Sequence, residues 1–234
     1  MKRSWIGGAI HHNMLGNVFD PKADVLILER LRPHWSQAGA IVFVTARTAD
    51  SIPKDVLLRW ESEKHEWLDR LELKLGYPVR RGRHWKVVLD ELSDNDRTIF
   101  IKHFNRQREI ELDLCHGRCW LRVPEYAKIV ADSLLHFDGS TYRMGDFVIM
   151  PNHFHALVSF ADPESMKNQF DSWLHWTATQ INRKTKIRGH FWQQEPFDHL
   201  VRSVEQYVYL RQYIADNPSK AGLQEGEYFY RRLD

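Results

Sequence analysis

The spacing of apolar residues along the second half of the chain alternates between the periods of strands and helices. Stretches rich in β-branched and aromatic residues predict strands at TYRMGDFVIM (141–150), HFHALVSF (153–160) and FDHLVRS (197–203). Apolar residues at helical spacing predict helices over 124–137, 162–181 and 203–217. A proline or a capping residue opens each helix, and Pro218 is expected to end the last one after Asn217.

The first half gives a weaker pattern. Residues 1–36 have no sustained period and predict an N-terminal extension, with a short helix at ADVLILERL. IVFVTAR (41–47) then predicts a strand. Helical spacing returns over 51–75 and 93–112, on either side of an irregular basic stretch, GYPVRRGRHWK. These helices follow the first strand, so residues from about 50 to 115 predict an insertion.

The order of these elements predicts an α+β fold. From residue 40 it reads strand, insertion, helix, strand, strand, helix, strand, helix. Without the insertion and the last helix, this is the order of a ferredoxin-like (RRM-like) unit, an antiparallel sheet with helices on one face. We therefore expect a single domain over 37–234, with an insertion at about 50–115 and an added C-terminal helix that carries Tyr213.

Composition excludes several classes of protein. The chain has 234 residues, 43% of them hydrophobic, which is enough for a core and argues against wholesale disorder. No apolar run approaches the roughly 20 residues of a membrane span, and no signal peptide is recognisable, so no membrane partner is expected. Cys115 and Cys119 lack the second pair that a zinc site requires. The low cysteine count fits a reducing, cytoplasmic location.

The first candidate for chemistry is the His-Phe-His sequence that opens the strand at 153. Alternate side chains of a strand share a face, so His153 and His155 point one way and Phe154 the other. One cation could bridge the two imidazoles. The alternative is a half-exposed strand with two ordinary histidines, since the chain has 13 histidines in all.

The predicted C-terminal helix supplies the second candidate. Tyr213 and Asn217 are four residues apart, so they are neighbours on one helical face. A tyrosine hydroxyl can act as a covalent nucleophile, and an asparagine oxygen can be a third metal ligand. Alternatively, Tyr213 is a packing aromatic and Asn217 only a helix end before proline.

Several segments together resemble a known family. VIMPNHFHALV is similar to the His-hydrophobic-His motif of HUH single-strand nucleases, and its flanks resemble the REP-associated tyrosine transposases of the single-tyrosine family. RCWLRVPEYAKIV, LLHFDGSTYRMGDFVIMPNHFHALV, FWQQEPFDHLVRS and YIADNPSKAGL follow in the family's order, and GAIVFVTARTADSIP resembles its first strand. The resemblance covers most of residues 36–223.

The resemblance implies a mechanism and a substrate. His153, His155 and Asn217 would bind a divalent cation, Mg²⁺ or Mn²⁺. Tyr213 would attack single-stranded DNA at hairpin-forming REP elements, giving a 5′-phosphotyrosine link and a free 3′-hydroxyl. Attack by another 3′-hydroxyl would rejoin strands. Both a homodimer and a monomer are compatible with the family.

A basic segment after the fifth predicted helix is a candidate DNA contact. Between Asp171 and Glu195 the chain has no acidic residue, and the predicted contacts there are Arg183, Lys184, Lys186, Arg188 and Trp192. Cations neutralise phosphates and aromatic rings stack on unpaired bases. The stretch RRGRHWK (80–86) has the same character. Either segment could instead be a solvated loop, and Trp192 could belong to the core.

Two other functions stay open at this level. One is a non-catalytic binder of structured single-stranded nucleic acid, which would need neither Tyr213 nor a metal. The other is a metal-dependent phosphodiesterase in which water attacks and no covalent intermediate forms. The spacing of Tyr213 and Asn217 favours a tyrosine strand transferase over both.

Overall fold

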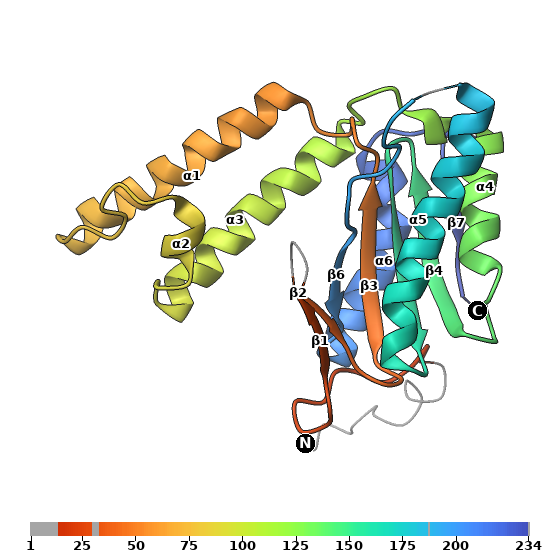
Figure 1. Cartoon of the computed structure of the whole chain (residues 1–234), viewed down its shortest axis with the longest axis horizontal. Helices are drawn as coiled ribbons and strands as arrows, with labels where there is room; N and C mark the ends of the chain where they lie inside the picture. Colours follow the sequence, from red (N-terminus) through yellow and green to blue (C-terminus); the bar gives the residue numbers. More distant parts are fainter. Residues whose placement is uncertain (1–13, 30–32, 187, 234) are drawn as a thin grey trace, which may run out of the picture. The chain divides into compact units, whose positions relative to one another are not determined.

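An antiparallel sheet of five strands, in the order β6-β3-β5-β4-β7, forms the centre of the fold in the computed structural model (Figure 1). The strands are β3 (Ile41–Arg47), β4 (Tyr142–Met150), β5 (His153–Phe160), β6 (Phe197–Leu200) and β7 (Phe229–Arg231). The structure describes residues 14–29, 33–186 and 188–233. The four strands predicted from sequence for this sheet are confirmed, whereas β7 was not predicted.

Helices cover both faces of this sheet. Apolar residues of α4 (Pro124–Leu135) and α5 (Pro163–Thr185) pack on one face, against Phe154, Ala156 and Val158 of β5. The helix α6 (Val204–Lys220) packs on the opposite face, and Figure 1 shows α5 in front of the sheet and α6 behind it. The predicted alternation of β5 is therefore confirmed, because its even-numbered residues belong to the α4–α5 side.

Local sequence explains where α6 begins, and Pro218 does not end it. Ser203 caps the helix by accepting a hydrogen bond of 3.1 Å from the backbone N–H of Gln206. The helix continues through Pro218 to Lys220, so the predicted end at Asn217 is wrong. Proline lacks an N–H but its fixed φ suits a helix. The backbone N–H of Ala221 still bonds to the carbonyl of Asn217 at 3.1 Å.

The N-terminal region forms a hairpin and not the expected short helix. The strands β1 (Leu26–Glu29) and β2 (Pro33–Ser36) pair antiparallel, from Leu26 opposite Ser36 to Glu29 opposite Pro33. Side chains along β1 alternate between half-buried and exposed, so a segment that was expected to be helical has the period of a strand. Residues 1–13 of the predicted extension, and residues 30 and 31 at the end of the predicted helix, lie outside the described ranges.

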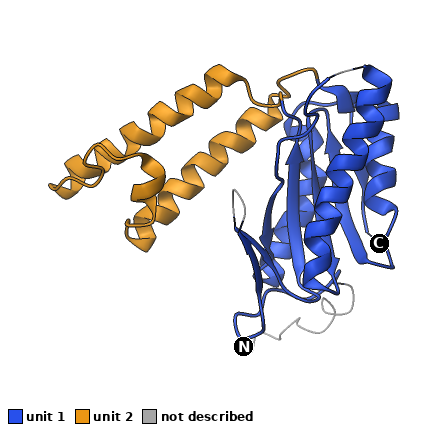
Figure 2. Ribbon diagram, in the orientation of Figure 1, with its two compact units in different colours: residues 1–49, 119–234 blue, residues 50–118 orange. Residues whose placement is uncertain are grey.

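The chain divides into two units, residues 1–49 with 119–234 and residues 50–118 (Figure 2). The second unit covers the predicted insertion. It consists of the helices α1 (Lys54–Leu75), α2 (Trp85–Leu89) and α3 (Asp94–Asp113), of which α2 was not predicted. The helices α1 and α3 are antiparallel, since the start of α1 packs on the end of α3 (Val56 on Leu112) and Trp67 packs on Phe100.

A short 3-10 helix, η2 (Trp120–Arg122), leads into α4. Within the described ranges, no helix combines the length and the apolar character that crossing a membrane requires.

Candidate active site

The two histidines of the HFH sequence lie side by side on β5. Their ring centroids are 4.7 Å apart, and both side chains are fully buried beneath α6. Imidazoles buried at this distance cannot both be protonated without strong repulsion, unless an anion separates them. Their proximity suits two neutral rings that share a cation.

Each histidine ring is held by a hydrogen bond at Nδ1. Nδ1 of His153 lies 2.7 Å from Oδ1 of Asn152, and Nδ1 of His155 lies 2.7 Å from Oγ1 of Thr45, its cross-strand partner on β3. An amide oxygen only accepts, so Nδ1 of His153 carries the proton of this bond. In a neutral ring, Nε2 would then hold the lone pair that a metal needs. Bonds of this kind fix the orientation of histidine ligands in metal sites.

The helix α6 brings Tyr213 to the same place. Its hydroxyl oxygen lies 3.4 Å from Nε2 of His155, and the two ring centroids are 5.1 Å apart. Phe43 supports both groups, since it stacks on His155 at 5.3 Å and meets Tyr213 edge-on at 6.0 Å. Tyr209, one turn earlier, stacks on Tyr213 but remains 65% exposed. The phenol of Tyr213 is thus set against the histidine pair.

Asn217, one helical turn after Tyr213 on α6, has a buried side-chain amide. Its side chain is fully buried, and neither atom of its amide has a hydrogen-bond partner among the residues that the structure describes. Burying an amide without partners destabilises a fold by about 1–3 kcal/mol. A cation bound to the amide oxygen would offset this cost. A buried amide without hydrogen-bond partners is therefore consistent with a metal ligand.

The donor set fits a divalent metal that accepts both nitrogen and oxygen. It comprises two imidazoles and one amide oxygen, from His153, His155 and Asn217. The described residues hold no group of three or more His, Cys, Asp or Glu side chains that could bind a metal. Because imidazole is softer than carboxylate, this set suits Mn²⁺ better than Mg²⁺.

A third histidine borders the site but differs from the other two. His199 on β6 lies 5.4 Å from Phe43, ring centroid to ring centroid, on the side away from His155. Burial lowers the pKa of His199 below its ordinary value, which keeps its ring neutral at neutral pH. It therefore adds aromatic packing and no charge.

The predicted basic contacts lie at the end of α5 and in the loop that follows. Arg183, Lys184, Lys186 and Arg188 are all exposed, and Lys184 pairs with Glu125 at 2.5 Å. The loop leads into residues 191–193, which pair with the end of β3, and Thr48 there donates to the carbonyl of Asn152. The residues that follow the basic segment thus lie at the end of the sheet where His153 pairs with Arg47.

Trp192 belongs to the core, so the prediction that it stacks on DNA bases does not fit this position. It is only 5% exposed, and its indole N–H donates to Oγ1 of Thr177 at 2.8 Å. Phe154 and Phe191 meet its ring edge-on. These contacts leave no face for an unpaired base.

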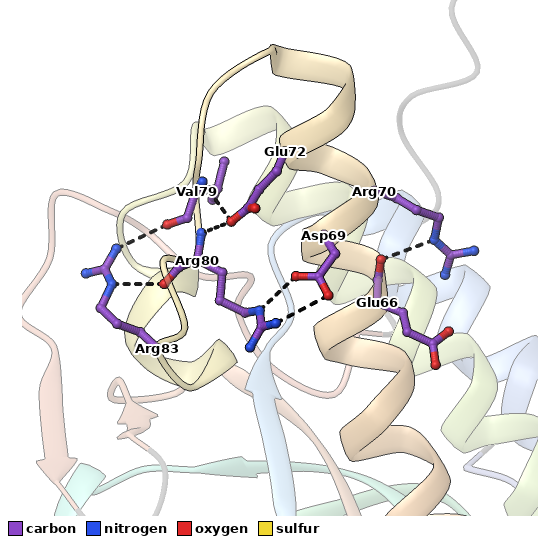
Figure 3. Close-up of polar contacts among 7 residues, drawn as sticks. All are labelled: Glu66, Asp69, Arg70, Glu72, Val79, Arg80 and Arg83. Atoms are coloured by element: carbon purple, nitrogen blue, oxygen red, sulfur yellow. Dashed lines mark hydrogen bonds and ion pairs between the residues drawn. The ribbon is translucent and has the colours of Figure 1, made fainter.

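In the other basic stretch, RRGRHWK, Arg80 and Arg83 form hydrogen bonds and ion pairs with residues of the same unit. Arg80 pairs with Asp69 at 2.9 Å and its backbone N–H bonds to Glu72, while Arg83 donates to the carbonyls of Val79 and Arg80 (Figure 3). Arg83 also forms a two-point ion pair with Glu91, at 2.6 and 2.7 Å. These two arginines hold the loop between α1 and α2, which weakens the case for a DNA contact there.

Sequence reasoning missed Thr45 and Asn152, the two residues that orient the histidines. Asn152 precedes His153 directly and could have been suspected as its partner. Thr45 lies 110 residues from His155 in the chain, and only the strand register brings them together.

Comparison with known proteins yields distant likenesses. No family model matches the chain. It is 24% identical over 148 residues to an uncharacterized protein of Haemophilus influenzae, a match that spans 53% of this chain and 74% of that protein. It is also similar to a solved structure described as "Structure of the REP associates tyrosine transposase bound to a REP hairpin". There the TM-score is 0.40, with 12% identity over 85% of this chain and 77% of that one.

Proposed function

We propose that this protein is a metal-dependent tyrosine strand transferase that cleaves and rejoins single-stranded hairpin DNA, as a transposase does. One observation carries the proposal: the Tyr213 hydroxyl lies 3.4 Å from Nε2 of His155. The ring of His155 in turn lies beside that of His153, with 4.7 Å between the ring centroids. The buried amide of Asn217, one helical turn further on, adds a third donor. The sequence motifs around these residues resemble REP-associated tyrosine transposases, which supports hairpin DNA of the REP type as the substrate.

His153, His155 and Asn217 would hold the cation, Mn²⁺ or Mg²⁺. When bound, a divalent cation polarises a phosphoryl oxygen and stabilises the negative charge that develops on it. Thr45 and Asn152 serve the ligands by fixing the ring orientation of the two histidines.

The reaction conserves phosphodiester bonds. The Tyr213 oxygen attacks phosphorus, a bond forms between them, and the bond from phosphorus to the 3′ oxygen breaks. The phenol gives up one proton and the departing 3′ oxygen takes up one, so cleavage needs no other reactant. Attack of a 3′-hydroxyl on the phosphotyrosine reverses the steps and joins two strands.

The fold is consistent with this assignment. The strand order β6-β3-β5-β4-β7 supports a ferredoxin-like arrangement with β7 added at one edge, and α6 packs on the face opposite α4 and α5. The helix α6 packs on β4 and β5 of the same chain. We propose an active site built within one monomer, with a homodimer that exchanges this helix as the alternative.

The alternative function is a non-catalytic binder of structured single-stranded nucleic acid. Such a binder would not require a phenol against the buried His155 or a buried, unsatisfied amide one helical turn further along α6. A phosphodiesterase that activates water would explain the histidines but not the position of Tyr213. Both alternatives make predictions that differ from those of the strand transferase.

A covalent-capture experiment separates the three functions. Labelled single-stranded hairpin DNA, taken from repeats that flank the gene, is incubated with the protein and Mn²⁺ or EDTA and run on a denaturing protein gel. We expect a labelled protein band with Mn²⁺ that disappears with EDTA and in Tyr213→Phe. Tyr209→Phe, on the exposed side of the same helix, serves as the matched control and should keep the band.

Cleaved DNA without a labelled protein would indicate attack by water. Tight binding in a native gel, unchanged in Tyr213→Phe and without any cleavage, would indicate the binding function.

A further inference from the structure

The continuation of α6 through Pro218 places a lysine beside the candidate nucleophile. Tyr213, Asn217 and Lys220 are separated by four and three residues, so they form one stripe along the helix. Nζ of Lys220 lies 5.2 Å from the centroid of the Tyr213 ring. A helix that ended at Asn217 would not hold Lys220 in this stripe.

Within the described part of the chain, Lys220 is the cation that lies against the Tyr213 ring. The other members of the site, two imidazoles, an amide and a hydroxyl, carry no fixed charge. Lys220 is exposed, and no carboxylate among the described residues forms an ion pair with it. Arg211, on the same helix, is by contrast engaged by Asp146 at 3.0 Å.

The helix dipole explains in part why a lysine stands at position 220. A lysine in the last turn interacts favourably with the negative end of the helix dipole. That interaction requires no particular direction of the side chain, whereas Lys220 turns back over the ring of Tyr213. An ammonium on a flexible four-carbon stem can leave an aromatic face for a phosphate oxygen nearby.

We propose that Lys220 binds the phosphate that Tyr213 attacks. This inference rests on the proposed strand-transfer function and names a substrate contact that the sequence did not indicate. A phosphodiester carries one negative charge, and charge builds up on its oxygens as the nucleophile approaches. A cation next to the nucleophile stabilises both the bound substrate and the transition state.

The test compares Lys220→Met, which keeps the stem and removes the charge, with Lys220→Arg, which keeps the charge. Lys167→Met on α5, another exposed lysine without an ion pair among the described residues, is the matched control. Under single-turnover conditions with saturating hairpin DNA and Mn²⁺, Lys220→Met should form the covalent adduct about 10- to 100-fold more slowly. Lys220→Arg should recover most of the rate, and Lys167→Met should match the wild type.

A second readout does not depend on cleavage. In a Tyr213→Phe background, DNA affinity is measured at several salt concentrations. Affinity falls as salt rises, and on single strands each phosphate interaction contributes about −0.7 to the slope of log affinity against log salt. Lys220→Met should therefore make this slope shallower by about 0.7, and Lys167→Met should leave it unchanged.

An unchanged adduct rate together with an unchanged salt slope in Lys220→Met would overturn the role of Lys220. If the wild type forms no adduct at all, the proposed function fails, while the salt slope still decides whether Lys220 touches a phosphate.

Discussion

Oγ1 of Thr45 lies 2.7 Å from Nδ1 of His155, and this contact between paired positions of β3 and β5 decides which ring nitrogen faces Tyr213. Because Nδ1 of His155 is hydrogen-bonded to Thr45 on β3, Nε2 is the nitrogen that lies 3.4 Å from the Tyr213 hydroxyl. The orientation of the candidate ligand thus depends on a hydroxyl that itself binds no metal.

Replacing this hydroxyl should weaken metal binding without disturbing the strand. Thr45→Val keeps the β-branched shape but removes the hydrogen bond, so we expect the affinity for Mn²⁺ to fall by about tenfold or more. Thr45→Ser retains the hydroxyl and should stay close to the wild type. Calorimetric titration with Mn²⁺ measures both. Equal affinities in all three proteins would mean that Thr45 does not orient His155.

A second prediction concerns the attachment of α6 to the sheet. Arg211, two residues before Tyr213, donates to both carboxylate oxygens of Asp146, at 3.0 and 3.1 Å, and to the carbonyl of Leu233 at 2.7 Å. The backbone N–H of Leu233 donates to the same carboxylate at 2.8 Å. The ion pair therefore joins β4, α6 and the C-terminal segment.

Removing Arg211 leaves the buried Asp146 carboxylate without its cation. We expect Arg211→Met to lower the free energy of unfolding by about 2 kcal/mol, less than for a fully buried pair because Arg211 is partly exposed. In urea unfolding, Asp146→Asn combined with Arg211→Met should cost less than the sum of the two single changes. Strict additivity would show that the two side chains do not interact in solution.

The sequence predicted those parts of the site that depend on local periodicity. The common face of His153 and His155 follows from the alternation of a strand, and the stripe of Tyr213 and Asn217 follows from helical spacing. What brings the two pairs together is the packing of α6 on the second face of the sheet, which the apolar pattern of α6 does not specify.

Two expectations from the sequence, the end of α6 and the role of Trp192, do not fit the structure, each for its own physical reason. Pro218 predicted a helix end, but the helix retains the bond from Ala221 to the Asn217 carbonyl and continues to Lys220. The basic neighbours of Trp192 in the sequence suggest a DNA contact, whereas its hydrogen bond to Thr177 is made across the fold and cannot be deduced from composition.

The two basic stretches should behave differently towards DNA, which gives a third prediction. Lys186 and Arg188 are exposed and form no ion pair with any described residue, whereas Arg83 is tied to Glu91. Changing Lys186 and Arg188 to alanine should weaken hairpin binding and lower the salt slope by about 0.7 for each phosphate that is no longer neutralised. Arg83→Ala should leave that slope unchanged. Fluorescence anisotropy at several salt concentrations measures both, and the reverse order of effects would place the DNA on residues 80–86.

The last prediction concerns the N-terminal hairpin, where His34 of β2 is buried against the carboxylates of Asp198 on β6 and Glu195. The hydrogen bond with Asp198, and then the negative charge nearby, raise the pKa of His34 above its ordinary value of 6.5, although burial opposes this shift. A raised pKa means that the folded protein holds this proton more tightly than the unfolded chain does.

The stability that His34 contributes is therefore complete below pH 6.5 and is lost as the pH rises through the pKa of the folded state. His34→Gln keeps a hydrogen-bonding side chain but cannot become charged. The difference in free energy of unfolding between wild type and His34→Gln, measured in urea from pH 5.5 to 9, should thus be largest at the acidic end and shrink as the pH rises. A difference that is constant with pH, or that grows towards alkaline pH, would show that His34 is not held in its charged form by Asp198.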